Sequence, residues 1–67
     1  MNIEAFRMGK DAYFTARKTG TPMPDSREAR KMAEAACPSG KSIEWRRDYF
    51  DGFFSMWRAF REMEDLI

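Results

Sequence analysis

The chain contains no histidine and only one cysteine, Cys37. A single cysteine cannot form a disulfide within the chain, and a free thiol is typical of reducing compartments, so we expect a cytoplasmic location. Without histidine, the sequence cannot supply a zinc finger or a Ser-His or Cys-His nucleophilic site. We therefore expect no metal, no cofactor and no enzymatic activity.

Long apolar runs and a dominant charge are also lacking. No stretch of about 18 apolar residues is present, and the start, MNIEAFRMGK, lacks the apolar block of a signal peptide, so we expect no membrane segment. The 12 basic residues nearly balance the 11 acidic ones, which is not typical of a strong nucleic-acid binder. A chain of 67 residues is long enough for one domain of marginal stability, and a homo-oligomer would stabilise it further.

Two clusters of helix-breaking residues divide the chain. Residues 20–24 (GTPMP) and 37–40 (CPSG) are both rich in Gly and Pro. The segments between them show apolar residues at helical spacing, and none alternates as a strand does. The sequence predicts a single all-α domain over 1–67, with helices at about 3–18, 26–36 and 42–65.

Residues with capping side chains precede the predicted helices. Asn2 stands before the first, and Asp25 with Glu28 three residues later forms the Asp variant of a capping box before the second. Ser39 or Ser42 is the expected cap of the third helix. These residues predict where each helix begins.

The first predicted helix carries a stripe of small residues: Ala5, Gly9, Ala12 and Ala16. Such a stripe lets a second helix approach closely. Glycine inside a helix costs about 1 kcal/mol relative to alanine, which indicates that close contact matters at Gly9.

The other side of this helix presents an aromatic ring among cations. It comprises Arg7, Lys10, Phe14, Arg17 and Lys18. An aromatic ring surrounded by cations suits RNA bases and phosphates or an acidic protein partner. A singly exposed Phe on a solvated basic face is the equally weighted alternative.

The third predicted helix is dominated by aromatic residues. Seven of the ten aromatics of the chain fall between Trp45 and Phe60, and the apolar side covers about half of the helical wheel. Either the first two helices flank this helix on both sides, or part of its apolar half meets another protein. We expect Trp45, Tyr49 and Met56 to lie in such an interface.

The segment from Ala35 to Ser42 satisfies a loose form of the nucleotide phosphate loop, with Gly40 and Lys41 in place. A true phosphate loop follows a β-strand, whereas the residues before this segment have a helical pattern. We therefore interpret it as a turn that ends in a helix cap. A phosphate held by the free N–H groups of the helix start is a weaker alternative.

The sequence also contains a family motif. Cys37-Pro38-x-Gly40 is followed by Arg46-x-x-Tyr49-x-x-Gly52-Phe53, and Gly9-x-x-Ala12 precedes both. This pattern resembles the ribosome modulation factor family of small bacterial and phage proteins. The resemblance implies a helical ribosome-hibernation protein that contacts ribosomal RNA and proteins near the messenger exit region. It assigns binding to Arg46, Tyr49, Gly52 and Phe53.

The chain departs from that family in three respects. It is nearly neutral, whereas the family is strongly basic; it has Ser39 where the family has an aromatic residue; and a helix-like insert over 24–36 replaces a short loop. Two functions are therefore expected. The first is a regulator that binds the ribosome or RNA through a basic face. The alternative is a protein-interaction module, of the kind phages encode, that binds a host protein or itself through the aromatic face.

Overall fold

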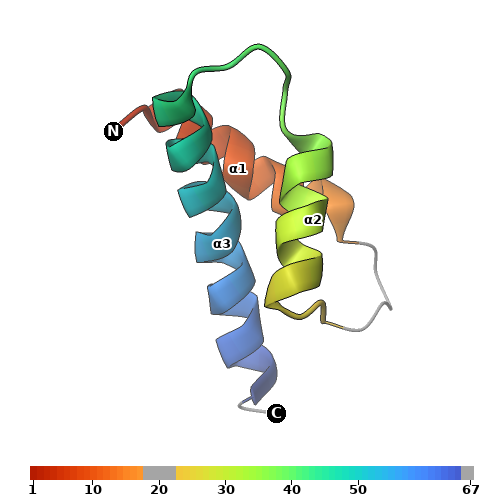
Figure 1. Ribbon diagram of the computed structural model, residues 1–67. Helices are drawn as coiled ribbons and strands as arrows, with labels where there is room; N and C mark the ends of the chain where they lie inside the picture. The colour runs from red at the N-terminus through yellow and green to blue at the C-terminus, as the bar shows by residue number, and fades with distance from the viewer. Residues whose placement is uncertain (18–22, 66–67) are drawn as a thin grey trace.

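The chain folds into three α-helices joined by two connections (Figure 1). The computed structural model describes residues 1–17 and 23–65, with side chains up to residue 63. Helix α1 spans Ile3–Ala16, α2 spans Ser26–Ala36 and α3 spans Ile43–Asp65, and the described part contains no strand. The predicted all-α, three-helix fold is confirmed. None of the described helices is sufficiently long and apolar to traverse a membrane.

Each helix begins at a side chain that accepts a backbone N–H three residues later. The acceptor oxygens belong to Asn2 at 3.0 Å, Asp25 at 2.8 Å and Ser42 at 3.1 Å. Such a cap stabilises a helix by about 1 kcal/mol because it satisfies one of the free donors of the first turn. The predicted caps are confirmed, with Ser42 rather than Ser39 at α3.

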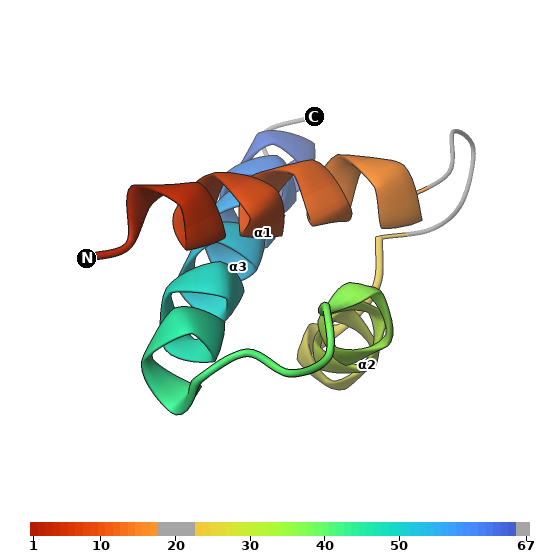
Figure 2. The same cartoon turned by 90° about the horizontal axis from the view of Figure 1, so that it is seen from above.

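Helix α1 lies across α3, and the two backbones meet at a pair of glycines (Figure 2). A methyl group on Gly9 would overlap the Tyr49 carbonyl oxygen and lie 2.8 Å from the Phe53 nitrogen. A methyl group on Gly52 would overlap the Phe6 carbonyl oxygen. The close approach expected at Gly9 is therefore present, and Gly52 is its counterpart on α3.

Although α1 crosses α3, the contacts between the two helices advance along both in the same chain direction. At their starts, the Asn2 backbone N–H donates to the Asp48 carboxylate at 2.7 Å. Near their other ends, the Phe14 and Phe60 rings meet edge to face with centroids 5.6 Å apart.

Helix α2 runs in the opposite direction to α3 and is tied to it at both ends. The Trp57 indole N–H donates to the Pro24 carbonyl just before α2 begins, at 2.8 Å. The Tyr49 hydroxyl donates to the Ala33 carbonyl near the end of α2, also at 2.8 Å. Tyr49, which comes earlier in α3 than Trp57, thus meets the later part of α2, as expected for antiparallel helices.

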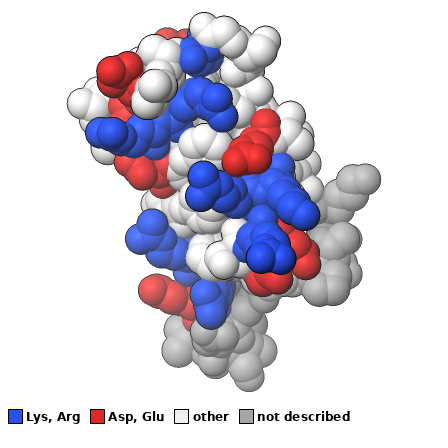
Figure 3. Space-filling view, in the orientation of Figure 1, with Lys and Arg blue, Asp and Glu red and all other residues white. Residues whose placement is uncertain are grey.

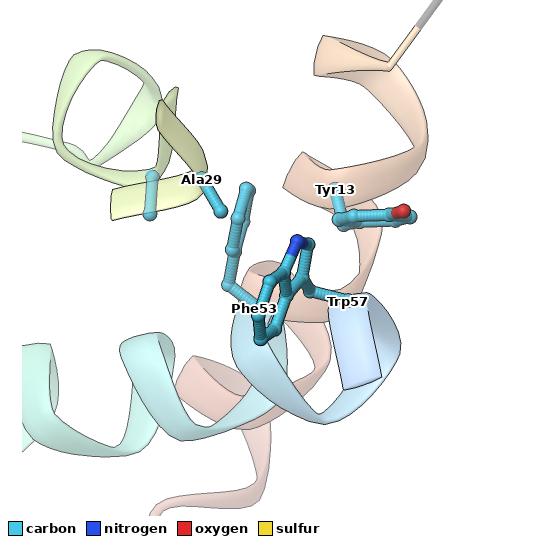
Figure 4. Packing of buried hydrophobic residues seen from close by; sticks show 5 residues of the cluster. Tyr13, Ala29, Phe53 and Trp57 are labelled. Atoms are coloured by element: carbon cyan, nitrogen blue, oxygen red, sulfur yellow. The ribbon is translucent and has the colours of Figure 1, made fainter. Parts of the chain in front are cut away.

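The core lies where α1 and α2 cover α3. One cluster joins Tyr13 of α1, Phe53 and Trp57 of α3, and Ala29 of α2 (Figure 4). Their packing includes an edge-to-face contact between Tyr13 and Phe53, with ring centroids 5.4 Å apart. A second cluster contains Ala5, Trp45 and Tyr49. Of the two expected arrangements for the wide apolar half of α3, flanking by both other helices accounts for these buried rings.

Candidate nucleic-acid interface

The outward side of α3 carries all four of its arginines. Residues 43, 46, 47, 50, 54, 58 and 61 follow one another at helical spacing and therefore share one arc of the helix. The guanidinium-bearing side chains are exposed, and the two phenylalanines between them are half-buried. We call this surface the arginine stripe; it comprises Ile43, Arg46, Arg47, Phe50, Phe54, Arg58 and Arg61.

The arginine stripe is not neutralised within the described residues. No carboxylate there lies within ion-pair distance of these four arginines, and the salt bridge at 3.3 Å between Arg30 and Glu34 belongs to α2. Glu44, Asp51 and Glu62 follow one another along the neighbouring arc of the helix. Because Asp51 and Glu62 stand four residues after Arg47 and Arg58, acidic side chains border one edge of the arginine stripe without forming an ion pair with it.

Several cations on α3 lie over aromatic rings instead of carboxylates. The Arg46 guanidinium carbon is 5.9 Å from the centroid of Phe50, and that of Arg61 is 5.2 Å from the centroid of Trp57. At exposed sites such contacts contribute about 0.5–1 kcal/mol. They hold the guanidinium groups near the surface while leaving their N–H donors available.

An open depression lies at the start of the arginine stripe. Ile43, Arg46, Arg47 and Phe50 line it, and its volume is about 250 Å³. Figure 3 shows Lys and Arg side chains spread over the face formed by α2 and α3, with both uncharged surface and Asp or Glu side chains among them. The depression therefore combines an apolar lining with two cationic side chains.

The expected basic face of α1 is partly occupied by contacts within the fold. Phe14 is 54% exposed, and the rest of its ring packs on Phe60 and Tyr13. Arg17 donates to the Tyr13 hydroxyl at 2.8 Å and lies 5.8 Å from the Phe60 centroid. Phe14 is therefore the edge of an aromatic cluster, not an isolated ring.

The described residues that remain on that face, Arg7 and Lys10, do not gather around Phe14 as the sequence predicted. Arg7 is exposed, and the Lys10 ammonium lies 5.8 Å from the centroid of Phe6. Lys18 lies outside the described residues.

The structure assigns Trp45 and Tyr49 to the core, in place of the expected partner interface. The Tyr49 side chain is 1% exposed and that of Phe53 is 0% exposed, because α1 and α2 cover them. Gly52 is buried against α1, and Met56 is half-buried against the core. Of the positions that the family resemblance assigns to binding, Arg46 alone is exposed.

Tyr49 also has an altered acidity. Burial of the phenol, and secondarily the nearby Cys37, raises its pKa from 10.0 to about 12. The neutral phenol is the form that donates to the Ala33 carbonyl. Tyr49 is therefore a structural hydrogen-bond donor between α3 and α2.

The segment that resembles a phosphate loop is a turn between two helices. Gly40 has a φ of 78°, a conformation that favours glycine, and Ser42 caps α3. The Lys41 ammonium lies 5.0 Å from the centroid of Trp45. Because α2 precedes this turn, the strand that a phosphate loop requires is not there.

Sequence reasoning missed the arginine stripe as a unit. Its phenylalanines belong to the apolar half of the helical wheel and its arginines largely to the polar half. Dividing the wheel into two halves therefore assigned the members of the stripe to different faces. The available signal was the spacing of Arg47, Phe50, Phe54, Arg58 and Arg61, which repeats every three or four residues.

Among the described residues, no group of three His, Cys, Asp or Glu side chains is placed to hold a metal ion. No protein-family model matches the chain, and no curated protein or solved structure shows significant similarity to it.

Proposed function

We propose that this protein is a non-enzymatic regulator that binds RNA through the arginine stripe, with ribosomal RNA as its first target. The observation that carries the proposal is the set of four exposed arginines on one arc of α3 with no ion-paired carboxylate among the described residues. The resemblance to the ribosome modulation factor family supports the same target. Ribosome binding would place the protein in the cytoplasm.

The chemistry of arginine favours phosphate as the ligand. The planar guanidinium presents several N–H donors that match phosphate oxygens, and a row of such groups follows a nucleic-acid backbone. The net charge of +1 is an average over the chain, whereas binding depends on the local field. The four arginines of the arginine stripe form no ion pair among the described residues, which leaves their charges available for phosphates.

The alternative of a protein-interaction module depended on the aromatic half of α3. Its central rings, Trp45 and Tyr49, are buried by α1 and α2. A protein partner would have to use other exposed residues, and the most prominent of these are the four arginines, whose planar donors match phosphate oxygens. We therefore argue for RNA.

Salt dependence of RNA binding tests the proposal. Fluorescence anisotropy would measure the affinity of the intact protein for labelled ribosomal RNA fragments over a series of KCl concentrations. Each phosphate contact contributes a slope of about 0.7–0.9 in the logarithm of affinity against the logarithm of salt. The double variant Arg47→Gln, Arg58→Gln should bind more weakly and lose roughly twice that slope.

A matched control makes the same change of charge away from the arginine stripe. The variant Arg7→Gln, Arg30→Gln removes one arginine from α1 and one from α2 and should retain most of the affinity. Equal losses in both double variants would contradict the assignment to the arginine stripe, and binding that does not respond to salt would contradict RNA binding through phosphates.

A further inference from the structure

Resting on the proposed RNA-binding function, we infer that the depression at the start of α3 holds one unpaired nucleobase of a single-stranded RNA, stacked on Phe50. The depression is lined by two apolar and two cationic side chains: Ile43, Phe50, Arg46 and Arg47. Binding to phosphates alone would use the arginines and leave the apolar lining without a ligand.

The apolar part of the depression fits a planar aromatic ligand. Ile43 is 78% exposed although it is an aliphatic residue, and the Phe50 ring beside it is only half-buried. The volume of about 250 Å³ is below that of a typical site for a drug-sized ligand, so it suits one planar ring system. A nucleobase stacked on Phe50 would cover both side chains.

The two arginines suit the rest of the nucleotide. Arg46 already lies over the Phe50 ring at 5.9 Å, and its long exposed side chain can move outward to stack on the far face of an inserted base. Arg47 borders the same depression and can pair with the attached phosphate. Aromatic rings and guanidinium planes are the usual stacking partners of unpaired RNA bases.

The remainder of the arginine stripe sets the length of the bound strand. From Arg47 to Arg61 the helix rises roughly 21 Å at about 1.5 Å per residue. A stacked single strand advances about 3.4 Å per nucleotide, so the arginine stripe follows roughly six nucleotides. Arg58 and Arg61 would contact phosphates toward one end of that segment, with the stacked base at the other.

A duplex does not fit the same surface. Its bases are paired and stacked inside the helix, and an A-form duplex offers side chains mainly phosphates and 2′-hydroxyls. Phe50 and Ile43 would then face the charged backbone. The depression therefore distinguishes single strands from duplexes.

Two oligoribonucleotides test the inference with the intact protein: a labelled unstructured strand of about twelve nucleotides and the duplex formed from it. We expect the single strand to bind about tenfold more tightly in fluorescence anisotropy, a factor within the range for stacking of one base. Phe50→Leu should remove about that factor for the single strand and leave duplex binding unchanged. Phe14→Leu, the same substitution at an exposed ring of α1 outside the arginine stripe, should retain the preference.

Circular dichroism would show whether each variant is folded. If Phe50→Leu does not fold, photocrosslinking of the unmodified protein still tests the inference. Photocrosslinking with strands that carry 4-thiouridine should yield adducts within residues 43–50. Crosslinks confined to α1, or equal affinity for strand and duplex, would overturn the inference. Salt-dependent binding of both RNAs without preference would leave the proposed function standing, whereas binding of neither would remove both.

Discussion

At the scale of single residues, Gly9 and Gly52 decide how closely α1 and α3 pack, since Gly9 faces the backbone of Tyr49 and Phe53 and Gly52 faces that of Phe6. Each glycine costs about 1 kcal/mol of helix stability relative to alanine. The absence of a side chain lets the two backbones pack closely, because each glycine faces backbone atoms of the other helix where a side chain would not fit. Packing across the crossing offsets the cost in helix propensity.

Gly52→Ala should destabilise the protein by about 1–3 kcal/mol, since the added methyl overlaps the Phe6 carbonyl and forces the helices apart. Chemical denaturation followed by circular dichroism measures the loss. Ser55→Ala, at an exposed position on the same helix, is the control and should change stability little. A stabilised Gly52→Ala would mean that helix propensity outweighs the contact.

The buried phenol of Tyr49 predicts a loss of stability at alkaline pH. In the unfolded chain the phenol ionises near its ordinary pKa of 10.0, whereas in the folded protein the pKa is about 12. Between these values the unfolded state releases a proton that the folded state retains, so the free energy of unfolding falls as pH rises from about 10 to about 12. Below about pH 10 the neutral phenol contributes fully.

Comparison with Tyr49→Phe isolates this contribution, because every other titrating group is common to both proteins. Between about pH 9 and about pH 11, the denaturation midpoint of the wild type should fall further than that of the variant. Equal shifts would show that the phenol is not protected in the folded state.

At the scale of elements, α2 depends on the other two helices. It has 11 residues, and its buried side chains are two alanines, Ala29 and Ala33, which remove little apolar surface from water. Its position is fixed by the hydrogen bonds from Trp57 and Tyr49 at its two ends. Its own sequence supplies the cap and the helical pattern, and α3 supplies the attachment.

A peptide of residues 23–40 should therefore show little helix on its own. Isolated helices of this length are marginal in water because nucleation is costly. Circular dichroism of the peptide, beside amide exchange of the same residues in the full chain, measures the difference. Substantial helix in the isolated peptide would show that α2 does not need its neighbours.

At the scale of the whole molecule, the local features could be predicted from the sequence. The features that depend on how α1 and α2 together cover α3 could not. Caps, helix extents and the close approach at Gly9 depend on neighbouring residues and were predicted from them. The burial of Trp45 and Tyr49 depends on how α1 and α2 share the apolar half of α3, which helical spacing alone does not determine. The arginine stripe follows from the same geometry, since its position is the part of α3 that the two covering helices leave open.

The shared direction of α1 and α3 has a consequence for the connection between them. A short loop commonly joins two helices as an antiparallel hairpin, whereas two helices whose contacts advance in the same direction need a connection that returns along them. Helix α2 is the rigid part of that return path. A tight turn in place of the segment would favour an antiparallel pair, in which Asn2 would no longer meet Asp48 and Phe6 would no longer meet Gly52. The insert thus sets the relative direction of α1 and α3.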